Sequence, residues 1–384
     1  MSELSQPSRA VLAVRLDSLG DVLLMGPALR ALRNGASRLD LLVSPAGAPA
    51  AELLPGIDDV ITFDAPWVGY EPPPVDSPGL LALVERLKEG GYDEAVIFTS
   101  FHQSPLPMAL LARLAGIPRV VGTSEDYAGS LLDVRHRRVA DGSPDTGGSE
   151  GGHEVPAALA LARAAGYELP KGDDLRLRLR PLGRPTGLVL SLPRPYVVVH
   201  PTASVPSRSI SDAQAVGLVG ALVAAGWQVV LTGAVSAPAD PSHGVGSFAP
   251  VGPESVTDLR GRTTFAELAQ ALAGARCVVT VNSGPAHLAA AVGTPVVSLF
   301  APVVPMERWG PWGVPCRVLG DQRADCRGSR ARECPIDGHP CLSGITAQAV
   351  VDAVRELAGP VSLQSVSSSD DSVDASVDDS VVVA

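Results

Sequence analysis

The chain has 384 residues, 46% of them hydrophobic, which is enough for two domains with a core each. Its 39 Gly and 35 Pro residues indicate many short connections in a globular α/β protein. A formal net charge of -11 excludes a general nucleic-acid-binding protein, because no basic face is available to displace counterions from phosphate.

The first apolar run is Val11–Leu16, which follows a polar N-terminal segment. It is short, it is interrupted by Arg15, and Asp17 follows it directly, so it is neither a signal peptide nor a membrane span. We therefore expect a cytoplasmic protein without a transmembrane segment. The run itself is typical of a buried strand.

The first half of the chain alternates between strand-like and helical segments. Strands are predicted at residues 11–16, 39–43, 60–63, 94–98 and 119–122. Helices are predicted at residues 22–32, 46–54, 80–88, 108–114 and 153–165. Alternation of this kind is typical of a parallel sheet covered by helices on both faces. In the turn after the first strand, Ser18 or Asp21 could cap the helix that follows.

The second half repeats the pattern after a Pro- and Arg-rich stretch at residues 171–195, which has the composition of an interdomain connection and could hold one strand. Strands are predicted at residues 196–200, 228–231, 278–281 and 296–300. Two helices begin with predicted capping boxes, Ser211 with Gln214 and Thr264 with Glu267. A last helix is predicted at residues 346–357.

These patterns divide the chain into a first domain, a connection, a second domain and a tail, at residues 1–175, 176–195, 196–360 and 361–384. The tail is rich in Ser, Asp and Val and has no positive charge. Such a composition cannot bury a core, so we expect the tail to be disordered. Residues 141–152 are expected to form a flexible insertion.

Two motif matches are rejected. A formal G-x-S-x-G match at residues 147–151 lies in low-complexity sequence, without the buried strand and helix that a nucleophile elbow needs. Residues 244–246, Gly-Val-Gly, match half of a dinucleotide-binding fingerprint, but no strand precedes them and no third Gly follows at the right spacing. Neither match supports a function.

The segment Val278–Pro302 predicts a buried strand, a tight loop, a helix of small residues and a second buried strand. Gly284 allows close approach of the backbone to a ligand, and Pro285 suits the first turn of a helix. The free N–H groups of that turn point beyond the carboxyl end of the strand. In an open α/β sheet this is where anionic ligands bind.

Three cysteines and a histidine, Cys326, Cys334, Cys341 and His339, could in principle supply four metal ligands. Their spacing lacks the C-x2-C knuckle of structural zinc sites, so no metal site is predicted. In a reducing compartment these cysteines are expected to be thiols.

Several segments, in this order, resemble glycosyltransferase family 9, the bacterial ADP-heptose:lipopolysaccharide heptosyltransferases. They are RLDSLGDVLLMGPALRALR at residues 15–33, HPTASVPSR at 200–208, DLRGRTTFAEL at 258–268, NSGPAHLAAAVGTPV at 282–296 and RECPIDGHPCL at 332–342. The resemblance implies a GT-B architecture, in which two Rossmann-like domains with parallel sheets face each other across a cleft. The first domain would serve the acceptor and the second would hold the nucleotide sugar.

The family's catalytic base corresponds to Asp21 in this sequence. A carboxylate near a helix start keeps a low pKa, so it would take the proton of the acceptor hydroxyl late in the attack. Asp17 is a nearby competitor, and the motif favours Asp21.

The resemblance also implies a set of donor-binding residues. The phosphate-binding cation corresponds to Arg208, where the family usually has Lys; Arg presents a fork to phosphate oxygens rather than a point charge. Asn282 stands where many family members have Asp, which leaves the donor sugar open, and His287 could be a donor contact or a packed structural residue. The other implied donor contacts are Ser18, Gly20, Thr202, Ser204, Gly233, Gly261, Thr263, Ser283 and Gly284.

The resemblance thus implies an inverting glycosyltransferase that transfers heptose from ADP-heptose to a lipopolysaccharide core or another glycan, where the acceptor could lie at the inner membrane surface. No Asp-x-Asp occurs in the chain, so no metal and no cofactor are expected besides the nucleotide sugar. The alternatives are a catalytically silent nucleotide-sugar-binding protein and a glycosyltransferase with another donor, acting on a cell-surface glycan or a natural product. A nicotinamide-dependent oxidoreductase is disfavoured because no G-x-G-x-x-G follows the first strand.

Overall fold

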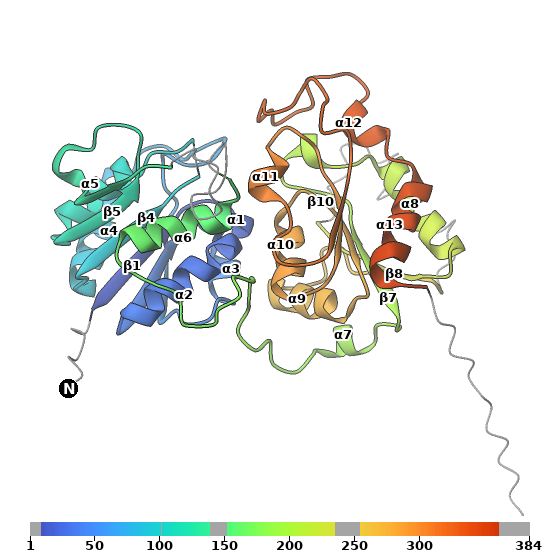
Figure 1. The fold of residues 1–384 in the computed structure, drawn as a ribbon, viewed down its shortest axis with the longest axis horizontal. Coiled ribbons are helices and arrows are strands. Elements are labelled where there is room, and N and C mark those ends of the chain that lie inside the picture. The colour runs from blue at the N-terminus through green and yellow to red at the C-terminus, as the bar shows by residue number, and fades with distance from the viewer. Residues whose placement is uncertain (1–8, 101, 139–151, 235–253, 361–384) are drawn as a thin grey trace, which may run out of the picture.

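The computed structural model describes residues 9–100, 102–138, 152–234 and 254–360. The predicted insertion except Gly152, the two rejected motif matches and the tail predicted to be disordered lie outside the described residues. The described chain forms two six-stranded sheets that lie side by side, each with all its strands parallel (Figure 1). This confirms the predicted α/β class with two Rossmann-like sheets.

The first sheet has the strand order β3-β2-β1-β4-β5-β6. Its strands are β1 (Ala10–Arg15), β2 (Arg38–Val43), β3 (Asp59–Thr62), β4 (Glu94–Phe98), β5 (Arg119–Thr123) and β6 (Val134–His136). Side chains of β1 alternate between two cores, with Val11 and Ala13 on one face and Leu12 and Val14 on the other. Because both faces are covered, the strand reads as a continuous apolar run.

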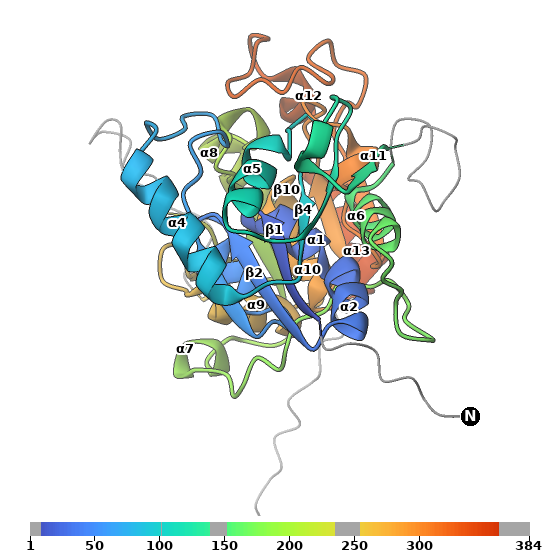
Figure 2. The same cartoon turned by 90° about the vertical axis from the view of Figure 1, so that its left-hand side faces the viewer.

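The helices of the first domain cover both faces of this sheet. They are α1 (Leu19–Leu24), α2 (Gly26–Gly35), α3 (Ala48–Ala51), α4 (Ser77–Gly90), α5 (Leu106–Leu114) and α6 (Glu154–Ala164). Helices α4 and α5 pack on the face away from the second domain (Figures 1 and 2). Helices α1, α2, α3 and α6 cover the opposite face, so they separate the first sheet from the second domain.

The second sheet has the order β12-β11-β10-β7-β8-β9. Its strands are β7 (Tyr196–His200), β8 (Gln228–Leu231), β9 (Val256–Asp258), β10 (Val278–Val281), β11 (Val296–Leu299) and β12 (Cys316–Leu319). The helices of this half are α7 (Gly187–Leu190), α8 (Asp212–Ala224), α9 (Phe265–Gly274), α10 (Gly284–Ala291), α11 (Met306–Trp309), α12 (Pro340–Ser343) and α13 (Ala347–Ala358). Helices α8 and α13 pack on the outer face, and α9 and α10 on the face toward the first domain.

The single helix predicted at residues 22–32 is wrong, because the structure has two helices there, α1 and α2, which meet at Met25. Pro27 has no N–H to donate to the carbonyl four residues earlier, so one regular helix cannot run through it. Pro27 instead lies in the first turn of α2, where a missing N–H costs nothing.

The other local predictions have mixed outcomes. Residues 171–195 contain the short helix α7 and no strand. The capping box of Thr264 and Glu267 forms completely. At Ser211 only half of the predicted box forms: the Ser211 hydroxyl accepts from the Gln214 N–H, but the Gln214 side chain donates to the Leu342 carbonyl at 2.8 Å. The elements β6, β9, β12, α11 and α12 were not predicted. The three strands are edge strands without a buried residue, so they lack the apolar run that marks the similarly short strands β8, β10 and β11.

Each sheet has a topological switch point, where the chain leaves one central strand for one edge and the other central strand for the opposite edge. In the first sheet it lies between β1 and β4, and in the second between β7 and β10. Ligands of such sheets bind outside the carboxyl ends of the strands at this point. The loops after these four strands are therefore the place to look for a site.

The two domains touch through α1 and α10 (Figure 1). A Cβ added at Gly284 would overlap Leu19 Cδ1, and one added at Gly20 would lie 2.9 Å from His287 Cδ2. Both positions therefore need glycine because the other domain's helix approaches so closely. Gly284, predicted above as a ligand contact, has this packing role in the structure.

Among the described residues, no helix has both the length and the apolar character needed to cross a bilayer. The longest, α4, has 14 residues, whereas a membrane-spanning helix takes about 20.

Replacing Gly284 with Ala is expected to destabilise the protein by about 1–3 kcal/mol, because the added methyl group overlaps Leu19 in a packed interface. Thermal or urea unfolding measures the change. Gly217→Ala is the matched control: Gly217 lies in α8 with no atom within 4 Å of an added Cβ, so this variant should be neutral or slightly stabilised. Leu19→Ala should remove most of the Gly284→Ala penalty; an equal penalty in both backgrounds would contradict the overlap.

Candidate active site

A buried arginine organises the carboxyl end of β1. Arg15 is the last residue of that strand, and only 2% of its side chain is exposed. Its Nε lies 2.7 Å from Asp17 Oδ2, and its Nη2 lies 3.2 Å from Asp21 Oδ1 and 3.5 Å from Glu154 Oε2. Nη2 also donates to Ser100 Oγ at 3.0 Å. Burial lowers the pKa of Arg15, but the three carboxylates together raise it by more than burial lowers it. The guanidinium therefore remains charged.

Two more arginines balance these carboxylates. Arg138 makes two hydrogen bonds to Glu154, at 2.8 and 3.1 Å. Arg308 of the second domain lies 3.8 Å from Glu154 Oε1, so the charge cluster crosses the domain interface. Burial raises the pKa of Glu154, but Arg138 and Arg15 outweigh it and hold that pKa below its usual value. The cluster thus pairs three guanidiniums with three carboxylates in a place from which water is largely excluded.

Asp21 is oriented by groups from both domains. Its Oδ2 accepts from Ser18 Oγ at 2.8 Å, and its Oδ1 accepts from Trp309 Nε1 at 3.1 Å as well as from Arg15. Burial of Asp21 raises its pKa, but Arg15, Ser18 and Trp309 together hold the pKa below its ordinary value. With 15% of its side chain exposed, Asp21 is an ionised carboxylate that a ligand can still reach.

Asp17, the competing carboxylate, is in a different electrostatic state. Burial raises its pKa to about 6, in spite of Arg15 and of a hydrogen bond from Gln103 Nε2 at 2.5 Å. Because the folded protein holds this proton more tightly than the unfolded chain does, Asp17 contributes stability at low pH that is lost as the pH rises through about 6. Asp21 and Glu154 have lowered pKa values, so they contribute stability that is present at neutral pH and is lost as the pH falls.

The second domain contributes the loops after β7, β8 and β10. His200 pairs with Thr232 Oγ1 at 3.0 Å, and burial lowers its pKa to about 4. Gly233 follows with φ +130°, and a Cβ there would lie 3.0 Å from Thr202 Oγ1. Gly261 N–H donates to the Gly233 carbonyl at 2.8 Å. These residues form one tight polar corner at the ends of β7 and β8.

Arg208 lies at the end of a short 3-10 turn, Pro206–Arg208. Its Nε is buried without a hydrogen-bond partner, although the guanidinium also has a hydrogen bond with the Tyr70 hydroxyl. Burial lowers the pKa of Arg208, while Tyr70 and Asp21 of the first domain act to raise it. An arginine in this position has donors available for an anion brought between the domains.

His287 of α10 lies against the first domain at Gly20. Burial lowers its pKa to about 4, with further contributions from His153 and Arg208, so the imidazole is neutral near pH 7. Its Nδ1 is buried and has no hydrogen-bond partner among the described residues. The charge of Asp21 also acts on this ring, so the two side chains belong to one site.

The predicted site residues thus fall into groups. Ser18, Gly20, Asp21, Arg208, Gly284 and His287 gather where the domains meet. Thr202, Gly233 and Gly261 form the corner at β7 and β8. Ser204 is exposed, Thr263 is half-buried, and Ser283 donates to the Val281 carbonyl at 3.3 Å. Their binding of a donor remains a prediction.

Asn282 has a structural use for both ends of its amide. Its Nδ2 donates to the Ala301 carbonyl at 3.2 Å, and its Oδ1 accepts from the Ala301 N–H at 3.1 Å. The pair ties the loop after β10 to the end of β11, and Asn282 is buried. Its side chain therefore faces the protein backbone.

Sequence reasoning missed the residues that set the state of Asp21. Arg15 interrupts an apolar run, which excludes a membrane span but does not by itself identify the partners of Arg15. An arginine at the end of a buried strand needs carboxylate partners, which is a signal for a charge cluster. Glu154, Arg308 and Trp309 are distant in sequence, so no local pattern identifies them.

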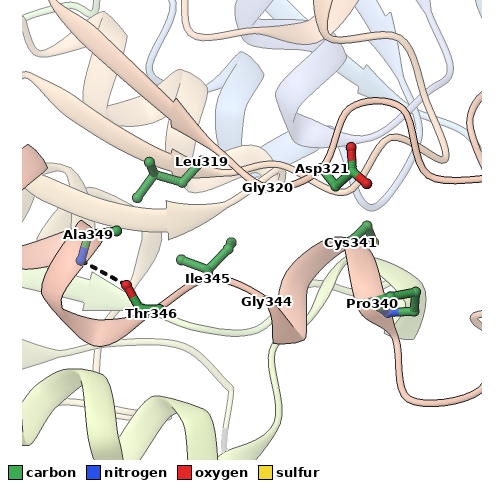
Figure 3. A pocket seen from close by; sticks show the side chains of 9 residues that line it. All are labelled: Leu319, Gly320, Asp321, Pro340, Cys341, Gly344, Ile345, Thr346 and Ala349. Atoms are coloured by element: carbon green, nitrogen blue, oxygen red, sulfur yellow. Dashed lines mark hydrogen bonds between the residues drawn. The ribbon is translucent and has the colours of Figure 1, made fainter.

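A cavity of about 270 Å³ lies elsewhere, at the end of β12 (Figure 3). Leu319, Gly320, Ile345 and the start of α13 line it, and Thr346 caps that helix through the Ala349 N–H. None of the predicted site residues lines this cavity, and it offers no cation for a phosphate group. We therefore place the candidate site at the domain interface, where charged side chains converge.

In the part of the chain that the structure describes, no group of three or more His, Cys, Asp and Glu side chains could hold a metal ion. The cysteines there are all free thiols. Cys326 and Cys341 are buried next to each other, and burial together with Cys326 raises the pKa of Cys341 to about 12. These thiols pack the loop before α12 against the second core.

Comparison with known proteins places this geometry in a family. The family model described as "Glycosyltransferase family 9 (heptosyltransferase)" matches residues 80–339. Lipopolysaccharide heptosyltransferase 3 from Escherichia coli is 34% identical over 42% of this chain and 46% of its own length. Lipopolysaccharide heptosyltransferase 1 from Pseudomonas aeruginosa is 29% identical over 77% of this chain and 79% of its own. The chain therefore spans about half the length of the first of these relatives.

Two of the solved structures that resemble this chain illustrate the shared fold. The E. coli ADP-heptose lps heptosyltransferase II matches 91% of this chain and 98% of its own, with a TM-score of 0.65 and 22% identity. A family 9 glycosyl transferase from Veillonella parvula matches 92% and 98%, with a TM-score of 0.67 and 18% identity. With the two parallel sheets, this likeness confirms the predicted GT-B architecture.

Replacing Arg15 with Met is expected to destabilise the protein by about 3–5 kcal/mol, because it leaves buried carboxylates without their cation. Urea unfolding at pH 7 measures this. The control is Arg86→Met, which breaks an exposed pair with Asp59 and should cost less than about 1 kcal/mol. Equal effects of the two variants would show that the cluster does not depend on Arg15.

Proposed function

The chain belongs to glycosyltransferase family 9, and from this membership we propose that it is an inverting, metal-independent glycosyltransferase that uses a nucleotide diphosphate sugar. The observation that carries the proposal is the convergence of Asp21 from the first domain with Arg208 and His287 from the second. A base and an anion-binding cation on opposite sides of one interface are what glycosyl transfer from a diphosphate requires.

In this reaction the acceptor hydroxyl oxygen attacks the anomeric carbon of the donor sugar from the face opposite the leaving group. The bond from that carbon to the phosphate oxygen breaks, and its electron pair leaves with the nucleoside diphosphate. Asp21 takes the hydroxyl proton. Because the pKa of Asp21 is lowered, it is a weak base and accepts the proton only as the hydroxyl becomes acidic during attack.

Arg208 is proposed to bind the diphosphate. Its Nε has no partner among the described residues, and a guanidinium can offer two parallel hydrogen bonds to phosphate oxygens. The negative charge on the leaving diphosphate grows as the anomeric bond breaks, so a fixed cation there lowers the barrier. Thr202, Gly233 and the N-terminal turn of α10 are proposed to complete the donor site.

The donor is proposed to be ADP-heptose and the acceptor the core of lipopolysaccharide. The support comes from relatives named as lipopolysaccharide heptosyltransferases and from a solved structure named for ADP-heptose. We further propose that the protein acts in the cytoplasm at the inner face of the membrane that carries this acceptor. We also propose the domain limits 1–175, 176–195 and 196–360. In this division the first domain binds the acceptor, residues 176–195 connect the domains, and the second domain binds the donor.

The donor is tested by thermal unfolding of the purified protein with ADP-heptose and with ADP-, GDP-, UDP- and dTDP-linked hexoses. A ligand that binds only the folded form stabilises it by about 2.7 kcal/mol when its concentration is a hundredfold above its Kd. The Tm rises as a result. We expect the largest shift with ADP-heptose. A larger shift with another nucleotide sugar would identify that sugar as the donor instead. If none of them shifts the Tm, the proposed function is contradicted.

Asp21→Asn is expected to lower kcat by about 10²–10⁴-fold, because the amide cannot accept the hydroxyl proton. The assay follows ADP release from ADP-heptose with a heptose-free lipopolysaccharide core as acceptor. Donor-induced stabilisation should persist in this variant. Asp59→Asn, at the exposed pair with Arg86, is the control and should keep full activity. A wild type that binds the donor and never turns over would instead indicate a silent binding protein.

The pH dependence of kcat/KM separates Asp21 from Asp17. With Asp21 as the base, the rate should stay level as the pH falls through 6, because this carboxylate remains ionised. With Asp17 as the base, the rate should fall with an apparent pKa of about 6. Unfolding measured at each pH excludes loss of the fold as the cause.

A further inference from the structure

A second arginine of the second domain is held in a strained backbone conformation next to the Arg208 turn. Arg330 has φ +57°, in the left-handed region, where the Cβ atom of a residue other than glycine comes too close to the backbone. The loop around it is fixed by backbone pairing: Gly328 N–H donates to the Pro302 carbonyl and Arg330 N–H to the Val303 carbonyl, both at 2.8 Å. Strain that persists in a well-tethered loop suggests a use for the side chain.

The residues after Arg330 are bonded to the turn that carries Arg208. Ser207 Oγ donates to the Ala331 carbonyl at 2.6 Å, and Ser207 N–H donates to the Arg332 carbonyl at 2.9 Å. Ser207 is only 1% exposed, so this junction is rigid. Arg208 and Arg330 are each the immediate neighbour of a residue in this junction, which places their backbones side by side.

The two guanidiniums lie near each other, and neither forms an ion pair with a carboxylate of the described residues, although most other buried or half-buried arginines of the chain have one. Arg208 has a hydrogen bond with Tyr70 and is influenced by the charge of Asp21. The charge of Arg330 lowers the pKa of Arg208 and that of His102 in the first domain, so Arg330 lies close to both. Two neighbouring cations repel each other, and an anion bound between them relieves that repulsion.

We propose that Arg330 is a second diphosphate-binding residue, which together with Arg208 holds the nucleoside diphosphate of the donor and of the product. This rests on the function proposed above and assigns a residue to it. As the anomeric bond breaks, its electron pair stays on the diphosphate, whose charge increases; two guanidiniums stabilise that charge better than one. The strained loop keeps the second guanidinium in place before the donor arrives.

Other arginines of the same loop have different partners. Arg332 Nη1 pairs with Glu71 of the first domain at 3.0 Å, and Arg327 lies 3.7 Å from Glu307. Both of these side chains are about half exposed. They therefore give matched controls in the same segment, with the same charge removed outside the proposed diphosphate site.

The test variant is Arg330→Gly, because glycine adopts φ +57° without strain and the variant should fold at least as well as the wild type. Binding of ADP and of adenosine is measured by calorimetry for the wild type, Arg330→Gly, Arg330→Lys and Arg327→Ala. We expect Arg330→Gly to weaken ADP binding by about 10- to 100-fold and to leave adenosine binding unchanged. Arg330→Lys should recover part of the loss, and Arg327→Ala should bind ADP like the wild type.

Unchanged ADP binding in Arg330→Gly would overturn the proposal and leave the proposed function intact. Equal weakening of ADP and adenosine would also overturn it, since the loop would then act by shape and not by charge. If the wild type binds no ADP, both the proposed function and the proposed role of Arg330 are contradicted. A lower Tm of Arg330→Gly would contradict the left-handed strain from which the argument starts.

Discussion

The buried guanidinium of Arg15 is the interaction on which the candidate site depends. An arginine at the end of a central strand is unfavourable in a core unless carboxylates surround it, and three of them do. Each carboxylate has its own consequence. Glu154 anchors α6 to the end of β1, Asp21 becomes an ionised group at the domain interface, and Asp17 is the one whose pKa ends above its ordinary value because burial outweighs Arg15.

The same cluster joins the two halves of the molecule. Trp309 donates to Asp21, and Arg308 adds a third positive charge near Glu154, so the second domain completes the environment of groups in the first. The close contact of α1 with α10 holds this arrangement, and it is possible only because Gly20 and Gly284 lack side chains. The electrostatic state of Asp21 therefore depends on the domains being in this mutual position.

The sequence was sufficient for the features that depend on local order. Apolar runs predicted all the parallel strands of both sheets except the edge strands β6, β9 and β12, and Thr264 with Glu267 predicted a helix start. It was insufficient where a contact joins distant segments. Gln214 leaves its predicted capping role to bind the Leu342 carbonyl, and Asp21 has a partner 288 positions away. The left-handed Arg330 has no sequence signal either, since its N–H pairs with the carbonyl of Val303, in the loop after β11.

Asn282 illustrates why a departure from a family pattern needs a structure to interpret. Its amide both donates to and accepts from the backbone of Ala301. An ionised aspartate could accept from the Ala301 N–H but would place a second acceptor against the Ala301 carbonyl, leaving that buried carbonyl unpaired. The neutral amide is therefore the side chain that satisfies both groups, and it fixes the loop leading into α10. This pairing uses only one of the two N–H groups of the amide, so a donor hydroxyl could still accept from the other, and the expected role of Asn282 in donor binding stays a prediction.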